Sequence, residues 1–165
     1  MATWDEFAEQ QPEMAERGRR QMQIPIAYLA TVRKDGSPRL HPVSPRFAGG
    51  RLFVAIEHGS PKRFDLRRTG RYALHALPPQ LGPDYDEFEF NMSGGATLVT
   101  DAATRAMVLE SEKASGRSFD DREWLFELDI ESALTTVWDH RPVLKDGRWI
   151  FTGTGKPTRR TWRAG

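Results

Sequence analysis

Residues 60–68 form the stretch whose residue types and spacing best suit the binding of an anion. Ser60 and Pro61 predict the start of a short helix, with Ser60 as its N-cap and Pro61 at the first helical position. Lys62 then falls in the first turn, where a cation is unfavourable beside the positive end of the helix dipole. A bound phosphate would relieve that repulsion. The alternative is a lysine on a short surface helix.

Three predicted strands and two turns would position this helix. The first strand is Ile24 to Val32, and Lys34-Asp35-Gly36 forms the turn that follows, because Asp-Gly readily adopts the positive φ of a tight hairpin. The second strand, Ser37 to Phe47, alternates in character and places Arg39, His41 and Val43 on one face. After Gly49-Gly50, Arg51 to Glu57 is the most apolar strand.

The rest of the chain is predicted to add further short strands and two helical regions. Residues 3–22 form an amphipathic helix with a Thr3–Glu6 capping box, and Pro12 could divide it. Residues 80–86 form a loop, and Asp101 caps a helix over 102–115. Further strands are expected at 71–77, 87–100, 124–137, near 143, at 149–152 and at 158–163. This pattern alone indicates an antiparallel β-barrel.

Composition limits the classes of function. A chain of 165 residues is expected to form one domain, residues 1–165, with 1–23 as an N-terminal helical extension. There are no cysteines, which excludes disulfides and thiolate chemistry, and a net charge of +1 argues against nucleic-acid binding. No stretch has the apolar length of a signal peptide or a membrane span, so we expect no membrane partner and a cytoplasmic location.

The four histidines give no metal motif. His41, His58, His75 and His140 show neither HExxH nor i, i+4 spacing, and without cysteine a zinc site is not expected. His41 and His75 lie on strands that could be adjacent, so either could donate a proton in a pocket or simply make a structural hydrogen bond.

Two segments together resemble a known family. The run Ala30 to Ser44 (ATVRKDGSPRLHPVS), followed by Gly59 to Arg68 (GSPKRFDLRR), is similar to the pyridoxamine 5′-phosphate oxidase-like, FMN-binding split-barrel family. The resemblance is weaker through 87–106 and 124–129 and ends at 162–165. It implies a mainly β fold, a six-stranded antiparallel split β-barrel with a few flanking helices. It also implies a homodimer with the cofactor at the subunit interface.

The resemblance assigns roles at the phosphate end of the cofactor. In the family, the lysine of the Ser-x-Lys segment meets the phosphate, which implies that role for Lys62 with Ser60 as a further donor. Many relatives have a second basic residue directly before this lysine, where this chain has Pro61. The arginines that could compensate are Arg63, Arg67 and Arg68.

The resemblance also assigns contacts to the flavin ring. In relatives the strand equivalent to residues 39–44 runs along the isoalloxazine, so Arg39, His41, Val43 and Ser44 become candidate cofactor contacts. Arg39 beside the flavin N1–C2 carbonyl would stabilise negative charge on the reduced ring.

The function implied is an FMN-binding oxidoreductase that transfers hydride or electrons to or from a small organic substrate, which the sequence does not specify. Because the family also contains members that use the deazaflavin F420, an F420-dependent reductase is the first alternative. A non-catalytic flavin- or haem-binding module is the second. No catalytic side chain can be assigned.

Overall fold

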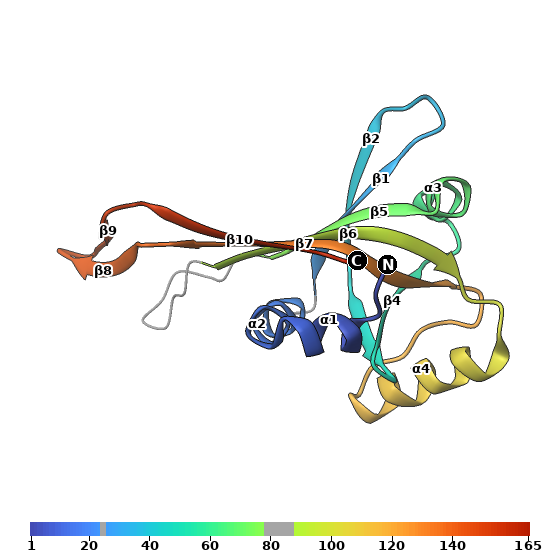
Figure 1. Ribbon diagram of the computed structural model, residues 1–165. Helices are drawn as coiled ribbons and strands as arrows, with labels where there is room; N and C mark the ends of the chain where they lie inside the picture. Colours follow the sequence, from blue (N-terminus) through green and yellow to red (C-terminus); the bar gives the residue numbers. More distant parts are fainter. Residues whose placement is uncertain (24–25, 78–87) are drawn as a thin grey trace.

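The computed structural model describes residues 1–23, 26–77 and 88–165, and in this part the chain is mainly β (Figure 1). The predicted loop at 80–86, and the first residues of the strands predicted from Ile24 and Glu87, lie outside the described residues. The helices are α1 (Trp4–Gln10), α2 (Pro12–Gln23), α3 (Lys62–Thr69) and α4 (Ala102–Ala114). The strands are β1 (Ala27–Val32), β2 (Pro38–Val43), β3 (Pro45–Ala48), β4 (Arg51–Ile56), β5 (Arg71–Ala76), β6 (Phe88–Leu98), β7 (Trp124–Trp138), β8 (Arg141–Lys145), β9 (Arg148–Thr152) and β10 (Pro157–Arg163).

The main sheet is antiparallel and curls into a split barrel, as predicted. It has eight strands, in the order β2-β1-β5-β6-β7-β4-β3, with β10 paired to β7 outside this path. Only Ser44 separates β2 from β3, so these two form one bent strand that pairs with β1 on one side and with β4 on the other. Counted this way, the barrel has the six strands expected, and β10 is an addition.

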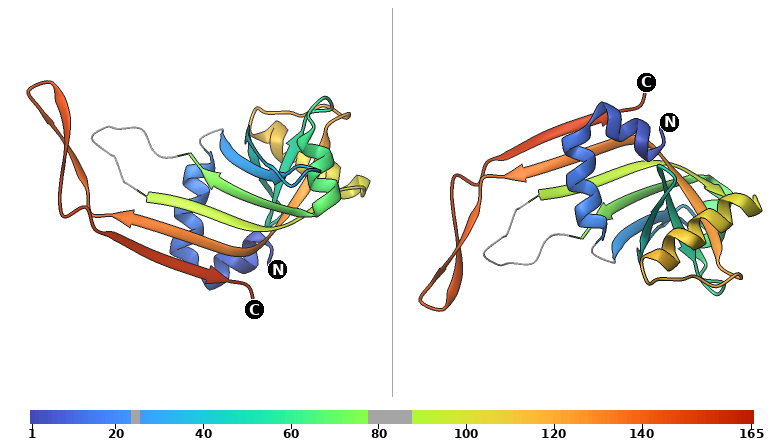
Figure 2. Two further views of the ribbon diagram at one scale, coloured as in Figure 1. Left: turned by 90° about the horizontal axis from the view of Figure 1, so that it is seen from above. Right: turned by 90° about the horizontal axis from the view of Figure 1, so that it is seen from below.

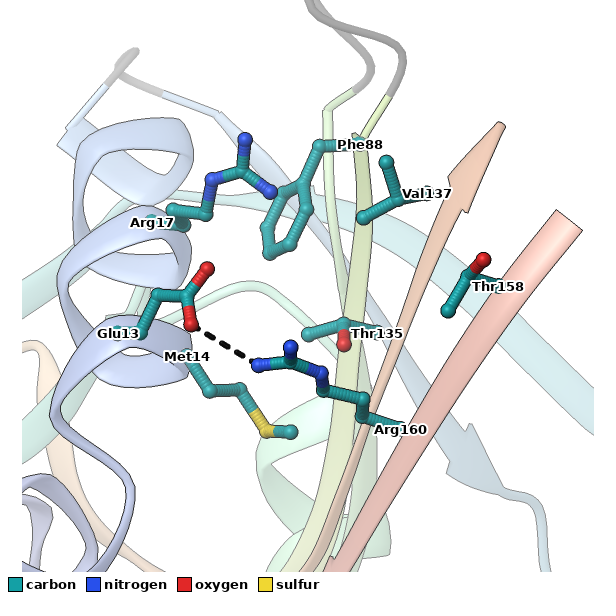
Figure 3. Close-up of a pocket in the computed structure, with 8 residues that line it drawn as sticks. All are labelled: Glu13, Met14, Arg17, Phe88, Thr135, Val137, Thr158 and Arg160. Atoms are coloured by element: carbon teal, nitrogen blue, oxygen red, sulfur yellow. Dashed lines mark hydrogen bonds and ion pairs between the residues drawn. The ribbon is translucent and has the colours of Figure 1, made fainter. Parts of the chain in front are cut away.

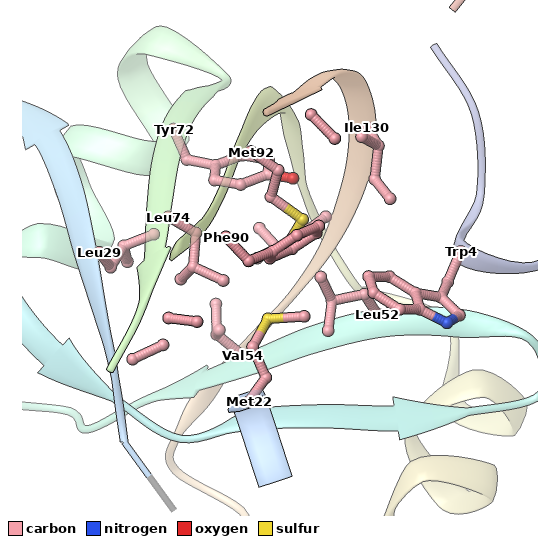
Figure 4. Close-up of a cluster of buried hydrophobic side chains, with 14 of the residues drawn as sticks. Trp4, Met22, Leu29, Leu52, Val54, Tyr72, Leu74, Phe90, Met92 and Ile130 are labelled. Carbon is pink, nitrogen blue, oxygen red and sulfur yellow. The ribbon is translucent and has the colours of Figure 1, made fainter. Parts of the chain in front are cut away.

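Alternation along the strands fills the barrel with apolar side chains. Leu29, Val54 and Leu74 point inward from three strands and meet Phe90 of β6 in one cluster (Figure 4). All four are almost fully buried. Burial of this kind is the main stabilisation of such a sheet.

Helices α1 and α2 pack beside the sheet and complete the core. Thr3 Oγ1 accepts a hydrogen bond from the Glu6 amide at 3.3 Å, which confirms the capping box. The predicted helical segment is divided at Pro12, which was the division that its sequence allowed, and a second helix begins there directly after Gln11. Trp4 and Phe7 of α1 are buried against the barrel.

Strands β8 and β9 form a separate two-stranded hairpin that projects from the body of the molecule (Figures 1 and 2). The turn lies at Asp146 and Gly147, which have φ of 50° and 73°, and this confirms the predicted Asp-Gly hairpin. We call residues 139–156 the arm.

Candidate functional site

Helix α3 begins one residue later than predicted. Pro61, with φ −67° and ψ −19°, takes the N-cap position and supplies no side-chain cap bond, so the assignment of Ser60 as N-cap is wrong. The physical reason is that the Pro61 carbonyl accepts the first helical hydrogen bonds, from the Phe64 amide at 3.1 Å and the Asp65 amide at 3.4 Å. The Arg63 amide donates to the Ser60 carbonyl at 3.4 Å and not to its hydroxyl. Lys62 becomes the first residue of the helix.

Asp65 ties the start of α3 to the β1–β2 hairpin. Its side chain is only 8% exposed, and it accepts hydrogen bonds from Arg39 Nε at 2.7 Å and Thr31 Oγ1 at 3.0 Å. Arg68 lies 3.8 Å from the other carboxylate oxygen and also donates to the Val32 carbonyl. Asp65 therefore fixes the direction in which the Arg39 guanidinium points.

Four basic side chains gather at this corner, and we call Arg33, Arg39, His41 and Lys62 the cationic cluster. Partial burial lowers the pKa of the Lys62 ammonium, and the charge of Arg39 lowers it further against the opposing effect of Glu57. Desolvation also lowers the pKa of the His41 imidazole, and the charge of Lys62 adds to that effect, followed by those of Arg39 and Arg33. The positive groups thus lie close enough to repel one another.

The cationic cluster holds more positive charge than its neighbours neutralise. Within the described ranges, the side chains of Arg33, His41 and Lys62 form no hydrogen bond or ion pair. Nearby carboxylates are already engaged. Asp65 binds Arg39, Asp35 accepts two hydrogen bonds from Ser37, and Glu57 accepts one from the Gly59 amide. An anion bound here would offset the repulsion.

An open hollow of about 580 Å³ lies between the β1–β2 turn and the start of α3. Arg39 and Asp65 line it from within, and Pro61 and Phe64 line it from the helix. The turn contributes Arg33, Lys34 and Asp35. The hollow is therefore bordered by the same elements that carry the cationic cluster.

The predicted arginines of α3 point in different directions. Arg67 lies with its guanidinium 5.6 Å from the centre of the Trp124 ring, and Arg63 lies 4.8 Å from the same ring and bonds to His58. Arg68 turns instead toward Asp65 and β1. The structure thus brings together Arg39, His41 and Lys62, with Arg68 joined through Asp65, and leaves Arg67 on Trp124.

The two remaining candidates of β2 lie at its bend. Val43 is buried and belongs to the barrel core, and Ser44 is the half-buried residue between β2 and β3. Arg39, His41 and Val43 share one face of β2, as the alternation predicted. Sequence reasoning missed Asp65 and Thr31, for which the only local signal was the i, i+3 spacing of Asp65 and Arg68.

A second hollow, of about 260 Å³, lies between α2 and strands β6, β7 and β10 (Figure 3). Its floor is apolar and includes Met14, Phe88 and Val137. At its rim Arg160 bonds to Glu13 at 2.9 Å. Arg17 also lines this hollow, and its guanidinium lies 4.8 Å from the centre of the Phe88 ring.

The described residues contain neither a metal-ligand cluster nor a membrane-spanning helix. In 1–23, 26–77 and 88–165, no group of three or more His, Asp or Glu side chains is placed to hold a metal ion. Nor does any helix in those ranges have the length and apolar character required to cross a membrane.

The fold is shared with solved proteins of low sequence identity. No protein-family model matches the chain, and no curated protein matches it either. A heme binding protein from Mycobacterium smegmatis aligns at TM-score 0.58 and 19% identity, covering 87% of this chain and 59% of that one. HutZ, the heme storage protein from Vibrio cholerae, aligns at 0.57 and 19%, covering 73% and 89%.

A third solved structure has the name that the sequence motifs suggested. A putative pyridoxamine 5′-phosphate oxidase from Listeria innocua aligns at TM-score 0.57 and 16% identity, covering 73% of this chain and 94% of that one. The chain spans about three fifths of the length of the mycobacterial protein. At these identities the likeness shows the split-barrel fold alone.

Proposed function

We propose that this protein binds FMN and acts as a flavin-dependent oxidoreductase, with the phosphate held at the cationic cluster. The observation that carries the proposal is the excess positive charge of Arg33 and Lys62 beside the hollow, with the His41 imidazole next to them. A half-buried ammonium whose pKa is lowered by burial gains most from a dianion, because the ion pair offsets its desolvation.

The residues present fit the cofactor in two further respects. The positive end of the α3 dipole lies at Lys62, although the Arg63, Phe64 and Asp65 amides are already bonded to the Ser60 and Pro61 carbonyls. Arg39 is held by Asp65 on the same face of β2 as His41, where its charge would act on the pyrimidine end of a flat ring. Flavin supplies hydride or electron transfer when it is bound, so the chain's own task is to bind the phosphate, orient the ring and stabilise negative charge.

The partner expected is a second copy of the chain. We propose a homodimer in which the hollow beside α3 is completed by the other subunit, because on one chain this hollow is open and shallow. A small organic substrate would then reach the ring from the remaining open side.

The proposal is tested by titrating purified protein with FMN and with riboflavin, which differs by lacking the phosphate. We expect FMN to bind with a Kd at least about 10-fold lower, because charge-assisted hydrogen bonds of about 1.5–3 kcal/mol are lost with riboflavin. Equal affinities would refute the phosphate site. A parallel titration with F420 tests the deazaflavin alternative, which is supported if F420 binds and FMN does not.

A haem-binding module is the second candidate, and it has its own support. Two of the structural neighbours are named as heme-binding and heme-storage proteins. The lowered pKa of His41 keeps its imidazole neutral near pH 7, the form that ligates iron, and the cluster would pair with haem propionates. Haemin titration decides this candidate. A Soret shift that is abolished in His41→Ala supports it with His41 as the ligand, a shift unchanged by that substitution excludes His41 as the ligand, and the absence of any Soret shift refutes the candidate.

A further inference from the structure

Exposed apolar side chains gather in two separate patches. In the part of the chain that the structure describes, every exposed large hydrophobic residue except Met1 and Phe64 belongs to one of them. One patch is on the β1–β2 hairpin, and its members are Ile26, Tyr28, Val32 and Leu40. The other is on the arm, and its members are Val143, Leu144, Trp149, Ile150 and Phe151. Apolar patches of this kind mark interaction surfaces.

The register of the arm gives it one wholly apolar face. Pro142 pairs with Phe151 and Leu144 pairs with Trp149, so these four side chains share a face of the two-stranded ribbon. On this apolar face, the Leu144 side chain is 59% exposed. The opposite face of the ribbon is mixed, since it carries the charged residues Arg141, Lys145 and Arg148 beside Val143 and Ile150.

The register of the β1–β2 hairpin likewise gives it one apolar face. Tyr28 pairs with Pro42, Ala30 with Leu40 and Val32 with Pro38, and Leu40 is 63% exposed. These pairs lie on the face opposite Arg39 and His41, which pair with Thr31 and Leu29. A partner seated on this outer face would therefore leave the cationic cluster accessible.

Hydrogen bonds and a ring stack close the base of the arm. Asp139 accepts hydrogen bonds from the Thr154 hydroxyl at 2.7 Å and from the Thr154 amide at 3.1 Å. The Trp138 and His140 rings stack with centroids 6.0 Å apart. A two-stranded ribbon is marginally stable by itself in water, so a preorganised apolar ribbon gains from being covered.

The two patches cannot cover each other within one chain, because the arm extends from one side of the body and the β1–β2 hairpin lies on another (Figures 1 and 2). A lipid surface or an unrelated protein bound to the arm would leave the β1–β2 face exposed. A second copy of this chain presents both surfaces and can cover both.

We propose that the protein forms a two-fold symmetric dimer in which the arm of each chain packs its apolar face on the outer face of the partner's β1–β2 hairpin. The ribbon is five residues long and two strands wide, so its face measures roughly 17 by 10 Å. One such contact is far below the roughly 800 Å² per partner of a stable interface. Reciprocal exchange doubles that contact, and the remaining area of a stable interface would come from the sheet surfaces between the two arms.

The absence of cysteine makes a direct test possible. Leu144→Cys and Leu40→Cys are prepared as separate, differently tagged proteins, mixed, and treated with a short bis-maleimide cross-linker. We expect a covalent heterodimer that carries both tags. Leu144→Cys mixed with Lys113→Cys, whose engineered thiol is on the exposed face of α4, is the matched control and should give none. Cross-linking of the control mixture, or of Leu144→Cys with itself alone, would overturn the proposal.

The mass of the cofactor-free protein is measured in parallel, so that failure of the arm exchange and failure of FMN binding are distinguished. We expect a dimer whose dissociation constant rises at least about 30-fold in the Trp149→Ser/Phe151→Ser variant, as for an aromatic anchor. Arg148→Ser, on the mixed face of the same ribbon, should change it less than about 3-fold, and circular dichroism checks that each variant is folded. A monomer at micromolar concentration, or a monomer that binds anionic lipid vesicles through the arm, would refute the exchange.

Discussion

Two clusters of charged side chains in this protein differ in how completely their charge is compensated. On α4, the Glu112 side chain is only 2% exposed and forms ion pairs with Arg46 of β3 and with Arg117, the latter at 2.9 Å. The Arg46 guanidinium also lies 5.2 Å from the centre of the Phe119 ring. Beside α3, by contrast, Lys62 and His41 form no ion pair among the described residues, and the nearby carboxylate of Glu57 accepts a hydrogen bond from the Gly59 amide.

The difference separates a structural cluster from a binding cluster. A buried carboxylate with two arginine partners holds α4 on β3, and a ligand has no unpaired charge there to bind. Half-buried cations without a counter-ion cost free energy in the empty protein, and that cost is recovered when an anion binds. Charge balance, and not the number of charged residues, therefore marks the candidate site.

The largest effect is expected at the compensated cluster. Glu112→Gln keeps the shape of the side chain but leaves Arg46 buried without its carboxylate. We expect the free energy of unfolding to fall by about 3–5 kcal/mol, measured by denaturant titration. The control is Glu110→Gln on the same helix, whose exposed pair with Lys113 should contribute less than about 0.5 kcal/mol. Equal effects of the two variants would remove the contrast between the clusters.

Lys62→Ala should act on binding and not on folding. We expect the free energy of FMN binding to weaken by about 1.5–3 kcal/mol, because a hydrogen bond to a charged group is lost. The free energy of unfolding of the empty protein should stay the same or rise slightly, since the desolvation of the ammonium and its repulsion with Arg39 are removed. Lys113→Ala is the matched lysine control. A loss of stability without any loss of FMN affinity would contradict the assignment.

The pH dependence of binding should reveal His41. In the empty protein its pKa is lowered, so the imidazole is neutral at pH 7, whereas a bound phosphate would raise that pKa. Binding of FMN therefore takes up a proton on His41. The affinity for FMN rises as the pH falls from 8 through the raised pKa that His41 has in the complex. We expect up to about a tenfold gain per unit of pKa shift. His41→Gln, titrated under the same conditions, corrects for protonation of the phosphate itself, and parallel curves for the two proteins would exclude His41 from the site.

The smallest effect is expected at Arg67. Its guanidinium lies on the Trp124 ring, away from Asp65, so Arg67→Ala should change the Kd for FMN by less than about 2-fold. Arg68→Ala, one residue further along, should weaken binding more, because Arg68 helps to fix Asp65 and through it Arg39. If Arg67→Ala has the larger effect, the phosphate lies on the Trp124 side of α3.

Local signals in the sequence predicted most of the fold. The turn at Asp35-Gly36, the capping box at Thr3, the cap at Asp101 and the hairpin at Asp146-Gly147 each depend on a few neighbouring residues, and each is present. The closing of the barrel by one bent strand at Ser44 was not visible, because it depends on pairings with two distant strands.

The candidate site was predictable only in part, for the same reason. Lys62 and the alternating face of β2 follow from local pattern. Asp65 was not identified, because its partners Arg39 and Thr31 lie 26 and 34 residues away in the chain. The N-cap position was assigned to Ser60, but Pro61 occupies it. Local sequence does not separate the two assignments, because a proline can stand either at the N-cap or at the first helical position.

The bend at Ser44 has a consequence for how this sequence can vary. Arg39 and His41 precede it, Arg46 follows it, and all three are carried by one continuous strand. A one-residue insertion or deletion within β2 would turn Arg39 and His41 to the outer face and bring Leu40 inside. We therefore expect length changes in this protein to accumulate in the β1–β2 turn and the arm, while the segment from Pro38 to Ala48 keeps a constant length.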